Sequence, residues 1–142
     1  MEALNVIAAK MVAKGKGILA ADESTPTCTK RFESIGVDST YDTRNEYRDM
    51  LFSADGLNEY ISGIIMFDET LKQSTTCEQR TPFPDYLASK GILPGIKVDT
   101  GAKELAGFTN EKITEGLDGL RSRLVDYYKL GARFAKWRAV IT

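Results

Sequence analysis

Short apolar segments alternate four times with amphipathic segments along the chain. The apolar segments are residues 17–21, 61–67, 95–99 and 131–141. The first two show no polar–apolar alternation, which is typical of parallel strands covered on both faces. Because parallel strands are connected by crossing helices, this pattern predicts an α/β fold with a parallel sheet and helices outside it.

The expected helices begin at recognisable signals. Thr25 followed by Pro26 is typical of an N-cap and a first helical residue, and Thr43 with Glu46 has the spacing of a capping box. The polar stretches at 72–83 and 100–113 predict loops. The expected helices cover residues 3–14, 25–36, 43–52, 84–90 and 113–130.

Composition excludes several classes of function. The 142 residues form one domain, and 19 basic against 20 acidic side chains create no field for nucleic acid or membrane binding. No signal peptide or membrane span is visible, and Cys28 and Cys77 form no CxxC pair, so we expect a cytoplasmic protein with free thiols. The absence of histidine removes Ser-His and Cys-His nucleophile pairs and disfavours a metal site.

The segment at 131–141 carries charge where a buried strand is expected. A period of two separates an apolar face from a face with two cations. The apolar face holds Ala135, Trp137, Ala139 and Ile141, and the other face holds Phe134, Lys136, Arg138 and Val140. Burying two cations costs roughly several kcal/mol unless anions meet them.

Charged side chains from three strands are expected at one edge of the sheet. They are Asp22, Lys97, Asp99, Lys136 and Arg138. In parallel α/β proteins, functional groups gather at the carboxyl ends of the strands. Two interpretations remain open: an internal ion-pair lattice in which Arg138 is left over, or a site that binds a phosphate or carboxylate ligand.

A lysine among other cations is a candidate nucleophile, since its ammonium form is disfavoured there. On this ground Lys136 is a candidate for Schiff-base formation and Lys97 is a weaker one. Asp22 would then act as the general acid or base beside it.

Four strings in this chain together resemble class I fructose-bisphosphate aldolase, over about residues 3–141. The strings are Lys16–Thr25, Gly95–Asp99, Thr114–Leu120 and Gly131–Arg138. The resemblance implies a TIM (β/α)8 barrel, of which residues 1–142 would form the first four βα units of a single domain. It also implies the reversible cleavage of fructose 1,6-bisphosphate to dihydroxyacetone phosphate and glyceraldehyde 3-phosphate through a lysine Schiff base. No cofactor or metal is expected, and the family suggests a glycolytic homotetramer.

The resemblance also implies roles for individual residues. Asp22 would assist carbinolamine formation and proton movement, and Lys136 would stabilise charge on intermediates. The expected substrate-binding residues are Ser24, Lys30, Arg31, Arg44, Lys97 and Arg138. Two departures from the family pattern are Pro26-Thr27, in place of a small residue followed by serine or threonine, and Thr100, in place of a lysine.

An eight-stranded barrel commonly needs about 250 residues. By resemblance, the Schiff-base lysine and the paired glutamates lie on later strands, so we expect this chain to be the N-terminal part of an aldolase and to be inactive alone. One alternative is a transaldolase-like enzyme that uses Lys136 as its nucleophile. Another is a non-catalytic half-barrel that binds a sugar phosphate or a protein partner.

Overall fold

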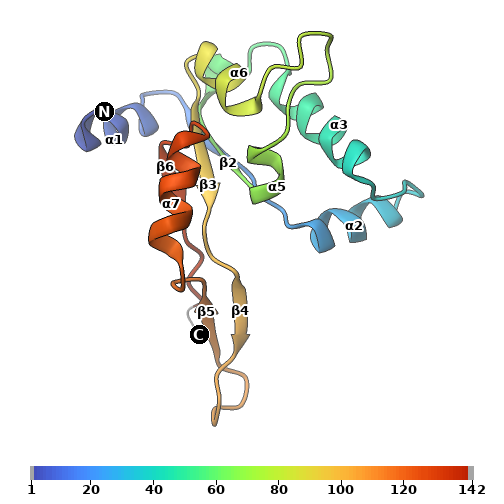
Figure 1. Ribbon diagram of the computed structural model, residues 1–142, viewed down its shortest axis with the longest axis vertical. Helices are drawn as coiled ribbons and strands as arrows, with labels where there is room; N and C mark the ends of the chain where they lie inside the picture. Colours follow the sequence, from blue (N-terminus) through green and yellow to red (C-terminus); the bar gives the residue numbers. More distant parts are fainter. Residues whose placement is uncertain (1, 141–142) are drawn as a thin grey trace.

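The computed structural model describes residues 2–140 (Figure 1). Its helices are α1 (Leu4–Met11), α2 (Thr25–Glu33), α3 (Tyr41–Phe52), α4 (Leu57–Tyr60), α5 (Asp68–Leu71), α6 (Phe83–Ser89) and α7 (Leu120–Lys129). Its strands are β1 (Gly17–Ala21), β2 (Ile61–Met66), β3 (Leu93–Lys97), β4 (Gly101–Glu104), β5 (Lys112–Glu115) and β6 (Phe134–Lys136).

Four of these strands form one parallel sheet, in the order β1-β2-β3-β6. Helices occur in every connection between consecutive strands of this sheet, so the α/β class expected from the sequence is confirmed. Strand β6 is shorter than the apolar segment at 131–141, and Ile141 lies outside the described residues.

One face of the sheet carries the hydrophobic core. Ile64 and Met66 of β2 and Ile96 of β3 are fully buried there against side chains of the helices. Tyr127 of α7 belongs to the same cluster, and Trp137 packs against it. Trp137 is therefore partly covered as expected, but Ala135 and Ala139 of the same expected face are exposed, so the prediction of a fully covered face is wrong. Strand β6 lies at the edge of the sheet, where less of its surface is covered.

The opposite face of the sheet holds the ring of Phe134. A Cβ atom on Gly95 would lie 2.2 Å from this ring, and one on Gly63 would lie 3.0 Å from it. The two glycines thus let an aromatic side chain lie directly on the strands beside it, since any larger residue would occupy the space of the ring.

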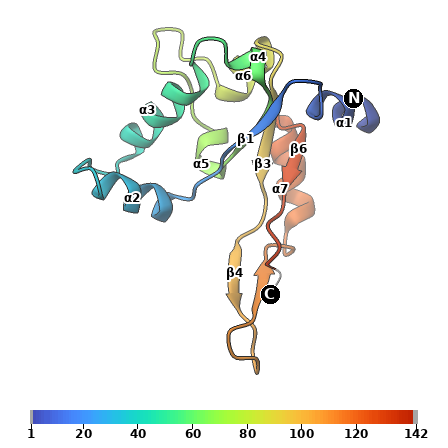
Figure 2. The ribbon, with the colours of Figure 1, turned by 180° about the vertical axis from the view of Figure 1, so that it is seen from behind.

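The prediction of a loop at residues 100–113 is wrong. Strands β4 and β5 form an antiparallel hairpin that projects from the rest of the molecule (Figures 1 and 2). The helix expected from residue 113 begins only at Leu120. Gly116 (φ 130°) and Gly119 (φ 67°) have backbone angles outside the right-handed helical region, so the helix cannot extend back through them.

Both expected N-caps also differ by a few residues. Ser24, rather than Thr25, precedes α2. The capping box of α3 joins Thr40 to Thr43, with hydrogen bonds of 3.1 and 2.9 Å, instead of joining Thr43 to Glu46. A hydroxyl both donates and accepts, so a second threonine can take the place of the glutamate.

Replacing Gly95 with alanine is expected to lower the free energy of unfolding by about 1–3 kcal/mol, because the new methyl group overlaps the Phe134 ring. Urea unfolding followed by circular dichroism measures this change. Gly17→Ala is the matched control, since a Cβ there meets no atom within 4 Å. The overlap is disproved if Gly95→Ala destabilises the Phe134→Ala variant as much as it destabilises the wild type.

Candidate active site

A cavity of about 330 Å³ lies at the carboxyl ends of β1, β3 and β6. Six of the eight residues predicted to be catalytic or substrate-binding line it: Asp22, Ser24, Arg31, Lys97, Lys136 and Arg138. The other lining residues are Ala20, Glu23, Thr27, Asp99 and Gly101. Strand ends that are far apart in the sequence therefore bring their charged side chains to one place.

Two ion pairs line this cavity. The ammonium nitrogen of Lys136 lies 2.6 Å from Oδ2 of Asp22, and that of Lys97 lies 3.6 Å from Oδ1 of Asp99. Lys97 and Lys136 are also register partners on β3 and β6, so the two cations start from neighbouring positions on one face. The carboxylates of Asp22 and Asp99 offset the repulsion between them.

The charges that line the cavity do not cancel. Four cationic and three anionic side chains face it, which leaves one positive charge in excess. Arg138 forms no ion pair with a carboxylate among residues 2–140. The ion-pair lattice expected from the sequence is thus present, with Arg138 left over among the described residues.

Asp99 organises this edge of the sheet. Its side chain is 1% exposed, and its carboxylate accepts hydrogen bonds from the backbone N–H groups of Gly101 (3.2 Å) and Arg138 (3.1 Å). The carboxylate therefore fixes the chain after β3 to the chain after β6. The sequence placed Asp99 among the charged side chains of this edge, on the same face as Lys97, but it predicted no catalytic or substrate-binding role for it.

Arg123 of α7 supports the same edge from outside. Its guanidinium donates to the carbonyl of Val98 at 2.9 Å and to the carbonyl of Gly116. Gly116 comes so close to this backbone that a Cβ there would lie 2.9 Å from the Thr100 nitrogen. Nothing in the local sequence reveals this contact, because the partners of Arg123 are set by the docking of α7.

Glu23 follows Asp22 and pairs with two arginines. Its Oε2 lies 2.6 Å from Nη1 of the buried Arg48, and its Oε1 accepts from Arg31. Burial raises the pKa of the Glu23 carboxyl, but the hydrogen bonds and charge of Arg48, with a smaller contribution from Arg31, bring it below its usual range. The hydrogen bond from Arg31 to Glu23 raises the pKa of the Arg31 guanidinium. The sequence analysis missed Glu23 as a site residue.

Two of the expected residues do not reach the cavity. Lys30 is exposed on α2 and does not line the cavity. Arg44 donates through Nε and Nη2 to both carboxylate oxygens of Glu69, at 2.7 and 2.8 Å. Its Nη1 donates to the Ser39 carbonyl at 3.0 Å. These hydrogen bonds to Glu69 raise the pKa of Arg44, and they hold its guanidinium away from the cavity.

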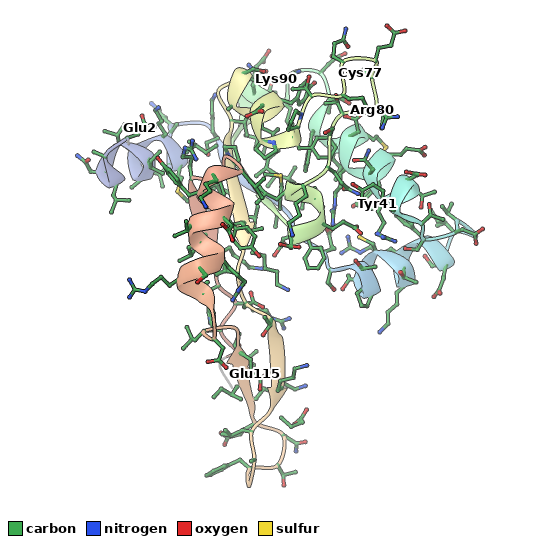
Figure 3. The ribbon with its side chains drawn as sticks, in the orientation of Figure 1. Glu2, Tyr41, Cys77, Arg80, Lys90 and Glu115 are labelled. Carbon is green, nitrogen blue, oxygen red and sulfur yellow. The ribbon has the colours of Figure 1, made fainter. Side chains whose placement is uncertain are left out.

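The two cysteines are both free, as expected. Burial raises the pKa of the Cys28 thiol. Cys77 is exposed on the loop before α6, near Arg80 and at the end of the molecule away from the hairpin that carries Glu115 (Figure 3). Within residues 2–140, no three His, Cys, Asp or Glu side chains gather in a way that could hold a metal ion.

A larger cavity of about 460 Å³ lies at the amino ends of the strands. Its basic side chains already have partners within the chain. Lys10 pairs with Glu2 at 2.5 Å, Lys16 donates to the Asn58 carbonyl at 2.5 Å, and Arg133 donates to backbone carbonyls. The carboxyl-end cavity is the better candidate despite its smaller volume, because the side chain of Arg138 there has neither a carboxylate nor a carbonyl partner among the described residues.

Comparison with known proteins identifies a family for this chain. Residues 3–142 match the family model of class I fructose-bisphosphate aldolase. A probable class 1 aldolase of Xylella fastidiosa is 57% identical over 141 residues, which are 99% of this chain and 42% of that relative. Aldolase 1 of Toxoplasma gondii is 56% identical over 135 residues, covering 95% of this chain and 37% of the relative.

A solved structure agrees with these sequence matches. Plasmodium falciparum fructose-bisphosphate aldolase superimposes with a TM-score of 0.89 at 51% identity, over 94% of this chain and 38% of that one. The chain thus spans about two fifths of the length of the proteins it matches. On the strength of its family match and these identities, it belongs to the class I fructose-bisphosphate aldolase family.

Proposed function

We propose that the complete gene product cleaves fructose 1,6-bisphosphate reversibly to dihydroxyacetone phosphate and glyceraldehyde 3-phosphate through a lysine Schiff base. The observation that carries this proposal is the cavity in which three strand ends place two lysines, an arginine and two aspartates with one positive charge in excess. A sugar phosphate is an anion that such a cavity can neutralise, and family membership supports the choice of substrate.

Asp22 and Lys136 are the proposed catalytic residues of this chain. The carboxylate of Asp22 can accept a proton from a substrate hydroxyl and return it, which is the task of a general acid–base group. Lys136, 2.6 Å away, can stabilise negative charge that develops on the same intermediate. Their contact holds both groups in the cavity before substrate arrives.

Four further residues are proposed to bind substrate. Lys97 and Arg138 line the cavity as cations beside the catalytic pair, and Ser24 and Arg31 line it from the loop after β1 and from α2. Arginine forks and hydroxyl groups suit the oxygens of a phosphate dianion. We propose no direct phosphate contact for Lys30 or Arg44, since neither lines the cavity.

We also propose that residues 1–142 supply the first four βα units of one (β/α)8 barrel domain. Within the described residues, β1 and β6 each pair on one side only, so the sheet has two open edges. Open parallel edges are rarely left uncovered in stable proteins. The Schiff-base lysine would then be contributed by a later strand of the complete gene product.

For assembly and localisation we propose a cytoplasmic homotetramer that acts in glycolysis. Exposed apolar side chains on the hairpin, on α7 and on the connection between them, among them Phe108, Leu117 and Val125, support association with other copies. A Cicer arietinum relative is described as a cytoplasmic isozyme, and it is 55% identical over 127 residues. No helix within residues 2–140 is long and apolar enough to cross a membrane.

Borohydride trapping with dihydroxyacetone phosphate tests the position of the nucleophile. The complete gene product should form a covalent adduct on a lysine outside residues 1–142, and the 142-residue chain alone should form none and show no aldol cleavage. Peptide mass spectrometry locates the adduct. An adduct on Lys136 with normal turnover would favour the transaldolase-like alternative instead, and phosphate binding without any turnover would favour the half-barrel binding module.

Asp22→Asn in the complete gene product should lower kcat by roughly 10²–10⁴-fold, because a general acid–base group is lost. Lys136→Met should lower it by roughly 10²–10³-fold, because a charge-stabilising group is lost. Lys129→Met is the charge-matched control, since Lys129 is exposed on α7 and pairs only with Asp126 among the described residues. Full activity in either test variant would remove that residue from the mechanism.

Light scattering after size exclusion tests the proposed assembly. The complete gene product should elute with the mass of four chains, and Leu117→Asp should shift it to smaller species, since a carboxylate in an apolar interface lacks a partner. A wild-type protein with the mass of one chain would contradict the tetramer.

A further inference from the structure

The loop that carries Asp22 is held by a buried arginine. Arg48 of α3 has a side chain that is 2% exposed. Its Nη1 donates to Oε2 of Glu23 at 2.6 Å, and its Nη2 donates to the carbonyl of the same residue at 2.8 Å. Arg48 thus binds both the main chain and the side chain of Glu23, so the carboxylate has little freedom to rotate.

The other carboxylate oxygen of Glu23 pairs with a second arginine. Oε1 accepts a hydrogen bond from Nη1 of Arg31, whose side chain is 56% exposed. Glu23 and Arg31 both line the cavity. A single carboxylate is therefore shared by two guanidinium groups, one buried and one at the cavity wall.

This sharing leaves charge and donors on Arg31 for a ligand. Arg48 lies away from water, where a cation depends strongly on its anion, and it occupies Oε2. Arg31 receives only the remaining oxygen, through one of its five N–H donors. Other donors of its fork can meet a second anion while the bond to Glu23 stays in place.

We propose that Glu23 is a positioning residue which, anchored by Arg48, holds the guanidinium of Arg31 at the cavity wall for a phosphate group of the substrate. The inference rests on the proposed function of this cavity. A long exposed arginine loses rotamer freedom when it binds a ligand, and a fixed partner removes part of that loss beforehand.

The alternative is that the Glu23–Arg31 contact is only an exposed ion pair, which typically contributes little. Glu23→Asp separates the two interpretations. It keeps the negative charge that Arg48 requires, but it withdraws the carboxylate by one methylene from Arg31. Arg48→Lys weakens the contact between residue 48 and Glu23, because an ammonium group lacks the planar fork of the guanidinium. It serves as the second variant if Glu23→Asp does not fold.

Binding of inorganic phosphate, measured by calorimetry, and KM for fructose 1,6-bisphosphate are the readouts in the complete gene product. Glu23→Asp should raise both Kd and KM roughly five- to tenfold, about the factor expected from releasing an arginine side chain. The kcat should stay within about twofold of the wild type. In the Arg31→Ala background, Glu23→Asp should have no further effect on either constant, since the residue it positions is absent.

Glu33→Gln, on the exposed surface of the same helix α2, is the control and should leave both constants unchanged. The inference fails if Glu23→Asp raises Kd by the same factor with and without Arg31, or if it lowers only the melting temperature. A wild-type protein that binds phosphate but cleaves no sugar phosphate would reject the proposed function instead, and the calorimetric comparison would still decide the role of Glu23.

Discussion

The ion pair between Lys136 and Asp22 joins the two edge strands of the sheet. In the order β1-β2-β3-β6 these strands are three spacings apart, which is roughly 14 Å in a flat sheet. Their terminal side chains nevertheless meet at 2.6 Å. A long lysine covers part of this distance, and curvature of the sheet toward its uncovered face covers the rest. The contact therefore depends on barrel-like curvature and helps to maintain it.

Two helix arginines keep the strand ends where this contact needs them. Arg48 of α3 donates to the carbonyl of Glu23 after β1, and Arg123 of α7 donates to the carbonyl of Val98 after β3. Each guanidinium satisfies backbone acceptors at a point where the regular ladder of the sheet has ended, and such acceptors are costly to leave unpaired. The helices thus determine the shape of the cavity as well as covering the core.

The sequence predicted what depends on local pattern. Strand positions, the parallel sheet and the convergence of Asp22, Lys97 and Lys136 follow from apolar runs and from alternation, and the structure contains them. It did not predict the β4–β5 hairpin, because apolar residues at 113 and 117 match a helical spacing that glycine backbone angles interrupt. The pairing of Arg44 with Glu69 and the anchoring of Glu23 by Arg48 each join residues 25 apart, so they require the packed fold.

The same geometry bears on the proposed division of the chemistry between parts of a barrel. Lys136 donates a hydrogen bond to Asp22, and an ammonium group that donates in this way has no lone pair with which to attack a carbonyl carbon. Lys97 is in a similar position beside Asp99. On the proposed function, the lysines of this cavity stabilise charge, and a lysine of a later strand forms the Schiff base. On the proposed barrel, that lysine would reach the cavity from the side that the curved sheet leaves open.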